Sequence, residues 1–401
     1  MKLLLALASG SSEALLDFAR RLVRTPSLSG HEGEVAAMVA AEMRSLGYDE
    51  VWRDRSGNVI GRLKGSGTGR SVMLNGHMDH VDPGPPAAWA HPPYEGHLAE
   101  GRLHGRATAD MKGALAAQVY SVAVLKQAGL QPSGDVLVTA VVQEETGGLG
   151  TQCLLEEGLR ADCAIVGEAT SLQLMRGHRG RLELLVDVAG CSVHASTPER
   201  GANPHFSVAR FVERLRGLDL PRDADFGGSS VAPTLVVSDQ TAGNVTPGRL
   251  TLHLDYRTVP AEDAASVTAR LQHVLEECLV DGCTGKVEVE LQRMVTYTGM
   301  ERVMPNVFPA YRLDPGEPLL DRARGALVEL TGMTPPEVGV WRFSTDGGYL
   351  MRAGIPVLGY GPGEEDLVHT TRESIAVDDL VQGAAGYAAL CLALSQPDTG
   401  S

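Results

Sequence analysis

Two adjacent glutamates, Glu144 and Glu145, follow the apolar run LVTAVVQ at residues 137–143. A short run of β-branched and apolar residues predicts a buried strand, and the glycine pair after the glutamates predicts a turn. Two carboxylates at the end of a buried strand repel each other and resist leaving water. They therefore need a cation, a proton or full exposure to solvent.

Further histidines and carboxylates stand at the ends of other apolar segments, in motifs that contain no cysteine. His77 and Asp79 are two residues apart and share one face if the chain is extended there. Asp110 stands at the start of a predicted helix, Glu168 follows a predicted strand and His369 follows a glycine turn. Ligation by His, Asp and Glu with open positions suits a catalytic zinc ion or a pair of them.

Each of these residues also has an ordinary structural interpretation. Asp110 can cap the N-terminus of a helix. A single loop histidine such as His369 can simply be solvated, and Glu168 can belong to a surface turn. Spacing alone therefore leaves a metal site and these structural roles as open alternatives.

The segments that carry these residues alternate between helix and strand patterns up to about residue 177. The expected helices are 32–46 and 109–128, and the expected strands are 71–79, 135–143 and 161–170. The alternation resumes after residue 293 and ends in a helical pattern over 377–394. It predicts an α/β fold, with a mostly parallel sheet sandwiched by helices.

The middle of the chain has a different order of elements. Strand patterns at 181–190, 232–239, 249–257 and 286–291 are interleaved with two helical patterns, one from Val208 to Leu215 and one from Val267 to Leu275. The order β-α-β-β-α-β is that of a ferredoxin-like unit. We therefore expect an α/β domain built from residues 1–177 and 294–401, interrupted by an inserted α+β domain at 178–293.

Motifs spread over nearly the whole chain resemble one family of hydrolases. The motifs are GHMDHVD, GRATADMKGALAA, QEETGGLGT, GEAT, CSVHASTPERGANP, STDGGYL and GPGEEDLVHTTRESI. They are similar to those of the zinc-dependent amidohydrolase and exopeptidase family that includes acetylornithine deacetylase, succinyl-diaminopimelate desuccinylase, aminoacylases and glutamate carboxypeptidases. The segments RGHRGRLEL and WRFSTDGG look most like a subgroup linked to selenium metabolism, the YgeY type.

This resemblance implies a ligand set for two metal ions, zinc first and cobalt or manganese as alternatives. Asp110 would bridge the two ions. His77 and Glu168 would complete one site, and Glu145 and His369 would complete the other. The resemblance also implies a cis peptide bond between Asp110 and Met111.

The resemblance also implies catalytic roles and a lid. Glu144 would act as general base, and Asp79 would orient His77 through its second ring nitrogen. His194 would reach from the inserted domain, the family's lid, into the site of a partner subunit and stabilise the oxyanion. The expected substrate contacts are Asn244, Arg257, Arg179 and Gly361.

The resemblance leads us to expect a small N-acyl amino acid or a dipeptide as substrate and a homodimer formed through the lid. Deacetylase or desuccinylase activity is the first expectation, and a dipeptidase, a carboxypeptidase or a selenium-linked amidohydrolase would use the same catalytic residues. A non-catalytic, metal-binding dimeric relative is the alternative from another class. Such a relative would be expected to lack a ligand or the base, and none is missing here.

Charge and composition limit the classes of binding partner that we expect. The 401 residues carry a formal net charge of -15 without a Lys/Arg run, which argues against nucleic acid or an anionic membrane. The start MKLLLALASG imitates a short signal peptide but continues as an amphipathic helix pattern, so we expect a cytoplasmic protein. Apart from that start, no segment approaches the length of an apolar membrane span.

Two groups of residues are expected to be ordinary. The six cysteines contain no CxxC pair and are interpreted as buried thiols in a reducing compartment, with a disulfide between Cys278 and Cys283 as the less favoured alternative. Histidines crowd the segment after the first ligand motif, where relatives often have apolar residues. We expect that segment to be a solvated loop; its histidines are His80, His91, His97 and His104.

Overall fold

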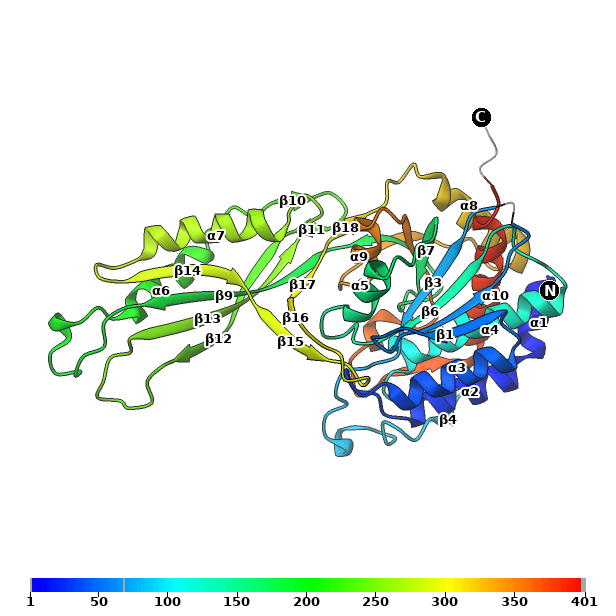
Figure 1. Cartoon of the computed structure of the whole chain (residues 1–401), viewed down its shortest axis with the longest axis horizontal. Helices are drawn as coiled ribbons and strands as arrows, with labels where there is room; N and C mark the ends of the chain where they lie inside the picture. The colour runs from blue at the N-terminus through cyan, green and yellow to red at the C-terminus, as the bar shows by residue number, and fades with distance from the viewer. Residues whose placement is uncertain (1, 68, 398–401) are drawn as a thin grey trace.

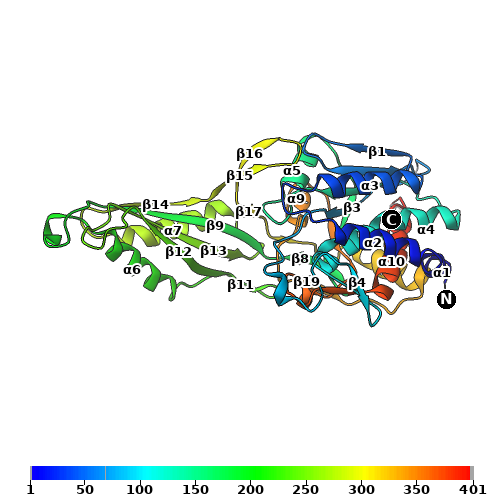
Figure 2. The same cartoon turned by 90° about the horizontal axis from the view of Figure 1, so that it is seen from below.

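The computed structural model describes residues 2–67 and 69–397, which form two lobes along one long axis (Figure 1). The large lobe contains both ends of the described chain and is built around a nine-stranded sheet. The smaller lobe, called the lid lobe here, projects from one side and has its own five-stranded sheet. Figure 2 shows the same two lobes from below, joined by a narrow waist.

The nine-stranded sheet has the order β1-β2-β6-β3-β7-β20-β8-β18, with β19 also paired to β8. Its strands are β1 Glu50–Arg53, β2 Val59–Leu63, β3 Val72–His77, β6 Val136–Val141, β7 Cys163–Val166, β8 Leu174–His178, β18 Tyr311–Arg312, β19 Val338–Trp341 and β20 Val357–Gly359. The central strands β6, β3, β7 and β20 run parallel, and the pairs toward the edges are mostly antiparallel. The predicted α/β fold with a mostly parallel sheet is confirmed.

Helices cover both faces of this sheet, because its central strands are apolar on both sides. Val72 and Leu74 of β3 join the larger apolar core, whereas Met73 between them faces the smaller core with Trp341. The helices of this lobe are α1 Leu3–Gly10, α2 Ser12–Arg24, α3 Gly33–Ser45, α4 Gly113–Ala128, α5 Leu149–Glu156, α8 Pro318–Ala326, α9 Gly347–Arg352 and α10 Val377–Leu394.

Short elements complete the large lobe. Three strands form a small separate sheet in the order β21-β5-β4, with bounds β4 His97–Ala99, β5 Arg102–His104 and β21 Ser374–Ala376. Irregular or single-turn helices lie at Pro86–Ala88, Thr108–Lys112, Leu327–Thr331 and Glu365–Leu367. The small sheet matters below because it carries His97 in β4 and His104 in β5, and His91 lies in the loop before β4.

The helices near both ends of the described chain pack into the large-lobe core. The start of the chain folds as α1, with Leu4 and Ala8 buried in the large-lobe core, so it packs as part of this domain. α10 is long and apolar enough to cross a membrane by length and composition. The prediction that no segment beyond the start approaches such a length is therefore wrong. However, 67% of that segment is buried inside the lobe, as expected for the core helix of a globular domain.

The lid lobe confirms the order β-α-β-β-α-β. Its sheet has the order β12-β13-β9-β14. The elements are β9 Gly180–Ala189, α6 Pro204–Leu215, β12 Ser230–Ser238, β13 Arg249–Thr258, α7 Ala264–Cys278 and β14 Thr284–Val289, with a single turn at Pro198–Arg200. Alternate residues of β13, from Leu250 to Tyr256, are buried with Phe211 of α6 and Leu271 of α7.

The connections between the lobes are more elaborate than the sequence suggested. A hairpin of β15 Leu291–Val295 and β16 Glu301–Pro305 places Met294 and Met304 in the large-lobe core. The next strand, β17 Val307–Phe308, pairs with β9 and so belongs to the lid sheet. A second small hairpin joins β10 Arg222–Asp223 and β11 Gly227–Gly228. The domain boundaries at 178 and 293 therefore stay a proposal. Just after residue 293, the chain contacts the large lobe and then returns to the lid sheet.

The cysteines only partly match the expectation. All six are free thiols, so Cys278 and Cys283 are not bonded to each other. Four are buried, but Cys191 is exposed and Cys283 is half-buried. The difference arises because Cys191 lies in the loop after β9, beyond the apolar layer of the lid sheet.

Candidate metal centre

The parallel strands bring the sequence-predicted ligands together. β6, β3 and β7 are neighbours in the sheet, so their carboxyl ends lie at one edge. His77 ends β3, Glu145 follows β6 and Glu168 follows β7. Asp110 comes from the segment before α4 and His369 from the loop before β21. The three strand ends and two loops therefore meet at one point of the large lobe.

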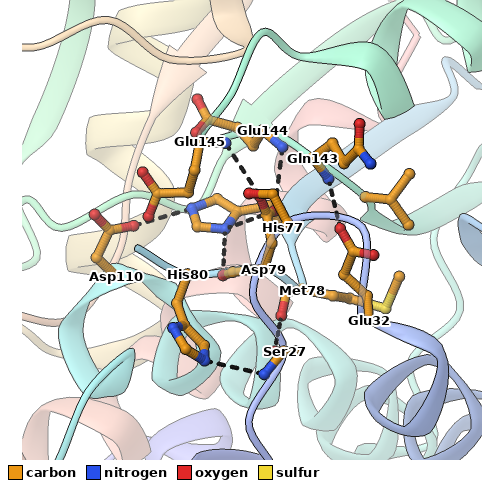
Figure 3. A network of polar contacts seen from close by, with 12 residues as sticks. Ser27, Glu32, His77, Met78, Asp79, His80, Asp110, Gln143, Glu144 and Glu145 are labelled. Atoms are coloured by element: carbon orange, nitrogen blue, oxygen red, sulfur yellow. Dashed lines mark hydrogen bonds and ion pairs between the residues drawn. The ribbon is translucent and has the colours of Figure 1, made fainter. Parts of the chain in front are cut away.

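Asp110 lies at the centre of this group, with one carboxylate oxygen toward each histidine. Its Oδ1 is 2.9 Å from His77 Nε2, and its Oδ2 is 3.0 Å from His369 Nε2. His77 Nε2 also lies 3.3 Å from Glu168 Oε1, and His369 Nε2 lies 3.2 Å from Glu145 Oε1. The five predicted ligands thus form two His-carboxylate groups that share Asp110. Figure 3 shows Asp110 beside His77, with Glu145 on the same side.

One expectation about the backbone at Asp110 matches the structure and another does not. The Asp110–Met111 peptide bond is cis, as the resemblance implied. The helix expected over 109–128 begins only at Gly113, because Asp110 and Met111 have non-helical backbone angles. Asp110 therefore does not cap α4, whose N-cap position is Lys112.

Burial makes this group of carboxylates unfavourable in isolation. Burial, with the nearby charge of Asp110, raises the pKa of Glu168 to about 8. Burial also raises the pKa of Glu144 well above its usual value, and it raises the pKa of Glu145. Burial opposes ionisation of Asp110 as well, but hydrogen bonds from His369 and His77 outweigh it and lower its pKa.

The donors present fit two metal ions. Two carboxylate oxygens in this group, Glu144 Oε1 and Glu168 Oε2, are buried without a hydrogen-bond partner. One ligand atom from each of His77, Asp110 and Glu145 lies within 4.8 Å of the other two, and the same holds for His77, Glu144 and Glu168. Imidazole and carboxylate donors suit zinc and similar divalent ions. Cations at this site would compensate the buried negative charge.

A turn, rather than an extended strand end, separates the two glutamates. β6 ends at Val141, and Gln143 adopts a positive φ of 53°. Glu144 and Glu145 lie in the turn that follows, closed by a hydrogen bond from Gly147 N to Glu144 O. The alternation of side chains along an extended strand therefore does not describe these two residues. Their different directions come from the turn.

Asp79 holds this turn in place. Its Oδ1 accepts the backbone N–H of Glu144 at 3.1 Å, and its Oδ2 accepts that of Glu145 at 3.3 Å (Figure 3). Ser29 Oγ donates to the same Oδ2 at 2.6 Å. His77 Nδ1 lies 3.0 Å from the backbone carbonyl oxygen of Asp79 and 3.5 Å from its Oδ1. Asp79 is thus the link between the histidine at the end of β3 and the glutamate turn after β6.

Two buried acidic residues that sequence reasoning missed support the same loops. Glu373 Oε1 accepts the backbone N–H of Ala109 at 3.0 Å and that of Asp110 at 3.2 Å, and Glu373 pairs with Arg106. Glu32 Oε1 accepts the N–H of Gln143 at 3.1 Å. Burial raises the pKa of each of these glutamates to about 7. Glu373 lies in the same motif as His369, four residues further on. Its position in that motif was the signal that could have identified it.

A buried lysine was also missed. Lys112 is completely buried, and its Nζ donates to the carbonyl oxygens of Leu22 at 3.0 Å and Thr25 at 2.7 Å, at the end of α2. Burial lowers its pKa to about 7. Lys112 therefore fastens the segment that carries Asp110 to α2.

A cavity of about 620 Å³ lies over the ligand group, between the two lobes. Its lining includes Asp110, Glu144, Glu145, Glu168 and His369 together with arginines from both lobes, namely Arg181, Arg257 and Arg342. The cavity has the size of a small-molecule site. Sequence reasoning singled out Arg257 but missed Arg181, which lies opposite it on the neighbouring strand β9.

Two expected substrate contacts lie elsewhere. Arg179 donates to the carbonyl oxygen of Gly228 at 3.1 Å and is not among the residues that line the cavity. Gly361 lies against the backbone of Gly167 and Glu168, where an added Cβ would come within 2.4 Å of Glu168 O. Gly361 thereby permits the close approach of β20 and the segment after β7 that contains Glu168, a predicted metal ligand.

The lid histidine lies far from this cavity in the same chain. β9 runs from Arg181 at the cavity to Ala189, a length of about 26 Å at about 3.3 Å per residue. His194 follows in the loop beyond that end, exposed, with its Nδ1 2.7 Å from Ser196 Oγ. Asn244 is its neighbour, since Ala195 N donates to Asn244 O at 2.8 Å. The two residues therefore form a pair at the far tip of the lid lobe.

One histidine of the expected solvated loop is fully buried. His80 Nε2 accepts the backbone N–H of Ser27 at 3.0 Å (Figure 3), and burial lowers its pKa to about 4. The interpretation of His80 as a solvated residue is wrong, because β3 continues into a bridge with Leu28 that carries His80 under the loop.

Comparison with known proteins agrees with this geometry. The profile of the family described as Peptidase family M20/M25/M40 matches residues 73–393. The protein YgeY of Escherichia coli K12 is 32% identical over 98% of this chain and 97% of its own length. A succinyl-diaminopimelate desuccinylase of Paracoccus denitrificans is 29% identical over 92% of this chain and 94% of its own length.

The fold is shared with solved structures. The structure of the Bacillus subtilis protein YXEP, described as a dinuclear metal-binding peptidase from the M20 family, superposes with a TM-score of 0.71. The two chains are 15% identical, and the match covers 96% of this chain and 98% of that one. These findings confirm the resemblance expected from the sequence motifs.

Proposed function

This chain belongs to the M20/M25/M40 peptidase family, and from that premise we propose that it cleaves the amide bond of a small N-acyl amino acid or related metabolite with two zinc ions bound. It is a metal-dependent hydrolase of amide or peptide bonds. Removal of an acetyl or succinyl group is the reaction we favour. The observation that carries the proposal is Asp110, whose two carboxylate oxygens each face a histidine backed by a second carboxylate.

The ligands proposed for the two ions follow from these contacts. His77 and Glu168 would hold one ion, His369 and Glu145 would hold the other, and Asp110 would bridge them. Zinc is our first choice, with cobalt or manganese as alternatives, because imidazole and carboxylate donors suit all three. When bound, the ions would polarise the scissile carbonyl group and promote ionisation of the attacking water.

Glu144 is the proposed general base. Its carboxylate is buried, lines the cavity and leaves Oε1 without a partner in the described structure, so that oxygen is available to a water molecule. The water oxygen forms a bond to the carbonyl carbon while Glu144 Oε1 takes the proton. Glu144 then passes this proton to the nitrogen as the carbon–nitrogen bond breaks.

Asp79 positions the base rather than touching the substrate. Its carboxylate accepts the backbone N–H groups of Glu144 and Glu145, and its backbone carbonyl oxygen lies beside His77 Nδ1. With Nδ1–H directed to that oxygen, His77 Nε2 remains free of a proton and is able to coordinate an ion.

Arg257 is the proposed contact for a substrate carboxylate. It lines the cavity from the lid side and is held by two hydrogen bonds to Asp255, at 2.6 and 2.9 Å. A guanidinium group in a fixed orientation favours planar, paired contacts with carboxylates. The cavity position supports Arg257 over Arg179, which binds a backbone carbonyl instead.

We also propose a homodimer in which His194 and Asn244 reach the cavity of the partner subunit. Within the described residues β12 pairs only with β13, so one edge of the lid sheet has no strand against it. This edge strand carries the exposed residues Leu235, Val236 and Val237. An apolar strand with an open edge favours pairing with another strand. His194 would then stabilise the oxyanion in the partner's site.

Mixing variant subunits tests the composite site. His194→Ala and Glu144→Gln subunits are each expected to be inactive alone. If His194 acts in the partner's site, a mixed dimer has one site with both wild-type groups, and activity returns on mixing. If mixing restores nothing although mixed dimers form, or if His194→Ala is active, the composite site is excluded.

Several alternative hydrolase activities would use the same catalytic residues. A dipeptidase or carboxypeptidase would differ in the cavity, and a selenium-linked amidohydrolase in the identity of the leaving group. A non-catalytic dimeric relative is disfavoured by the presence of all five ligands and Glu144 in one place. We propose a cytoplasmic location, which the six free thiols support.

The test of the overall function is release of free amine from a panel of N-acyl amino acids and dipeptides. The protein is loaded with zinc or cobalt, and Glu144→Gln serves as the matched control. Cleavage of one acyl class with an inactive control supports the proposal and identifies the substrate class. Two bound ions per chain without cleavage of any panel member would exclude common acyl amino acids. Failure to bind metal would overturn the ligand assignment.

A further inference from the structure

Three histidines gather at the small sheet of the large lobe, two in its strands and His91 in the loop before β4. The rings of His91 and His97 are stacked, with centroids 3.9 Å apart and planes at 17°. His104 lies 5.2 Å from His91 between ring centroids. His97 and His104 are opposite each other in the β4–β5 hairpin. The sequence predicts a solvated loop here, whereas the structure brings the rings of two hairpin histidines and His91 together.

The group also contains a carboxylate at ligand distance. One ligand atom from each of His91, Glu95 and His97 lies within 4.8 Å of the other two. His97 Nδ1 is 3.8 Å from Glu95 Oε1. The side chains of His97 and Glu95 are 35% and 48% exposed, so an ion has access from solvent and small side-chain rotations suffice to close the site. Glu95 also provides a carboxylate next to the two imidazole rings.

The backbone around these residues is held by the rest of the lobe. Arg24 of α2 donates to the carbonyl oxygen of Glu95 at 2.8 Å, and Arg20 donates to that of Gly96 at 3.1 Å. β5 is paired with β21 on its other side, where His104 lies opposite Ser374. A site on a fixed hairpin loses less entropy on binding an ion than the same residues on a mobile loop.

We propose that His91, Glu95 and His97 bind one divalent transition-metal ion such as Zn²⁺, with His104 as the adjacent fourth donor. Two imidazoles and a carboxylate match the donors that zinc takes in proteins, and a third histidine or a water molecule completes a tetrahedron. None of these residues lines the cavity over Asp110, so this site is separate from the catalytic centre.

The position of the site indicates a supporting role. β5 pairs with β21, which begins directly after Glu373, and Glu373 binds the backbone N–H of Asp110. An ion that joins His91 and Glu95 to His97 of β4 would stiffen the small sheet, whose strand β21 begins next to Glu373. We therefore expect the site to stabilise the large lobe without taking part in the reaction.

Counting bound zinc in matched variants tests the proposal. The wild-type protein, His97→Ala, Glu95→Gln and the control His273→Ala are dialysed against the same free Zn²⁺ concentration, and zinc is measured by mass spectrometry. His273 is an exposed histidine with a neighbouring glutamate, Glu277, 3.5 Å away, and so matches the chemistry of a single His-Glu pair. The conservative Glu95→Gln change keeps the result interpretable if His97→Ala disturbs the fold.

The expected result is that wild type and His273→Ala bind one zinc ion more per chain than His97→Ala. Glu95→Gln should lower the affinity for that ion about tenfold or more. Even changes to residues beyond the direct ligands lower metal affinity about 10–100-fold. Equal zinc content in wild type and His97→Ala would overturn the proposal, and an equal loss in His273→Ala would show only adventitious surface binding. The comparison is a difference between variants, so it holds even if the catalytic centre binds fewer than two ions.

Discussion

The two lobes differ in how the charge of buried acidic side chains is balanced. The lid group contains one such side chain, Glu262, with its hydrogen-bond partners. In the lid lobe, Glu262 accepts hydrogen bonds from Tyr256 at 2.9 Å and Arg270 at 2.7 Å through one oxygen. Its other oxygen accepts the hydroxyl of Ser229 and the backbone N–H of Val259. Both carboxylate oxygens therefore have partners, and a positive charge lies beside them.

The group in the large lobe is not balanced by the protein. It contains the four carboxylates of Asp110, Glu144, Glu145 and Glu168 but only two histidines. Two buried oxygens of the group have no partner, and the pKa values of three of the four carboxyl groups are raised. Buried charge without a counter-charge costs several kcal/mol per ion. The lid group is thus a structural network, whereas the large-lobe group is built to hold cations.

The largest expected effect is on turnover. Glu144→Gln removes a proton acceptor from the large-lobe group and keeps its shape, so the rate should fall by about 10²–10⁴-fold. Zinc content and the free energy of unfolding should change little, because Glu144 is not among the five proposed ligands. Kinetics with the best panel substrate, metal analysis and circular dichroism check this prediction. A near-normal rate would show that Glu144 is not the base.

Removal of metal should destabilise the large lobe. A ligand that binds only the folded state stabilises it by about 2.7 kcal/mol when present at about one hundred times its Kd. Chelation followed by thermal unfolding should therefore lower the Tm of wild type, and zinc should restore it. His369→Ala, which lacks one proposed ligand, should show a smaller shift. The same shift in both proteins would argue against His369 as a ligand.

The metal-free protein should lose stability as the pH rises. The pKa of Glu168 is about 8 in the folded metal-free state against 4.5 for an ordinary glutamate, so the stabilisation from the retained proton is full below 4.5 and lost as the pH rises through 8. Burial lowers the pKa of His369, but hydrogen bonds to Asp110 and Glu145 raise it to about 10, against 6.5 for an ordinary histidine. Its contribution is likewise lost as the pH rises through 10.

Urea unfolding between pH 6 and pH 9 measures this trend. The free energy of unfolding of the chelated protein should fall over that interval, by at most about 1.4 kcal/mol per pH unit for each proton exchanged. The zinc-loaded protein should show a flatter profile, because cations replace the protons. A profile that rises with pH in the chelated protein would contradict the charge imbalance inferred for the large-lobe group.

The smallest effect is expected in the lid lobe. Glu262→Gln leaves the Arg270 guanidinium without its counter-charge, but Arg270 is 29% exposed and is partly solvated, so the expected loss is about 1–2 kcal/mol. The loss should be the same with and without zinc. Glu213→Gln is the control, since Glu213 is 76% exposed in its pair with Arg216. A loss of unfolding free energy that appears only in the chelated protein would show that the two lobes are energetically coupled.

Much of the site was predictable because its residues stand next to strongly patterned segments. His77, Asp110, Glu145, Glu168 and His369 each follow or precede an apolar run, and parallel strands necessarily end at a common edge. The lid was predictable for the same reason, since β13 alternates buried and exposed residues without interruption. The helix expected from residue 109 began late because the backbone at Asp110 follows the requirements of the site rather than local helix propensity.

The order of helices and strands, and the residue types placed at the strand ends, were determined by the sequence itself through local periodicity and turn chemistry. Only the tertiary structure decided which charges support one another across the chain. Glu373 and Asp110 are 263 residues apart, and Glu32 and Gln143 are 111 apart. The packing of His91 against the hairpin that pairs His97 with His104 was equally hidden. Such contacts depend on how distant segments pack, and no periodicity of neighbouring residues encodes them.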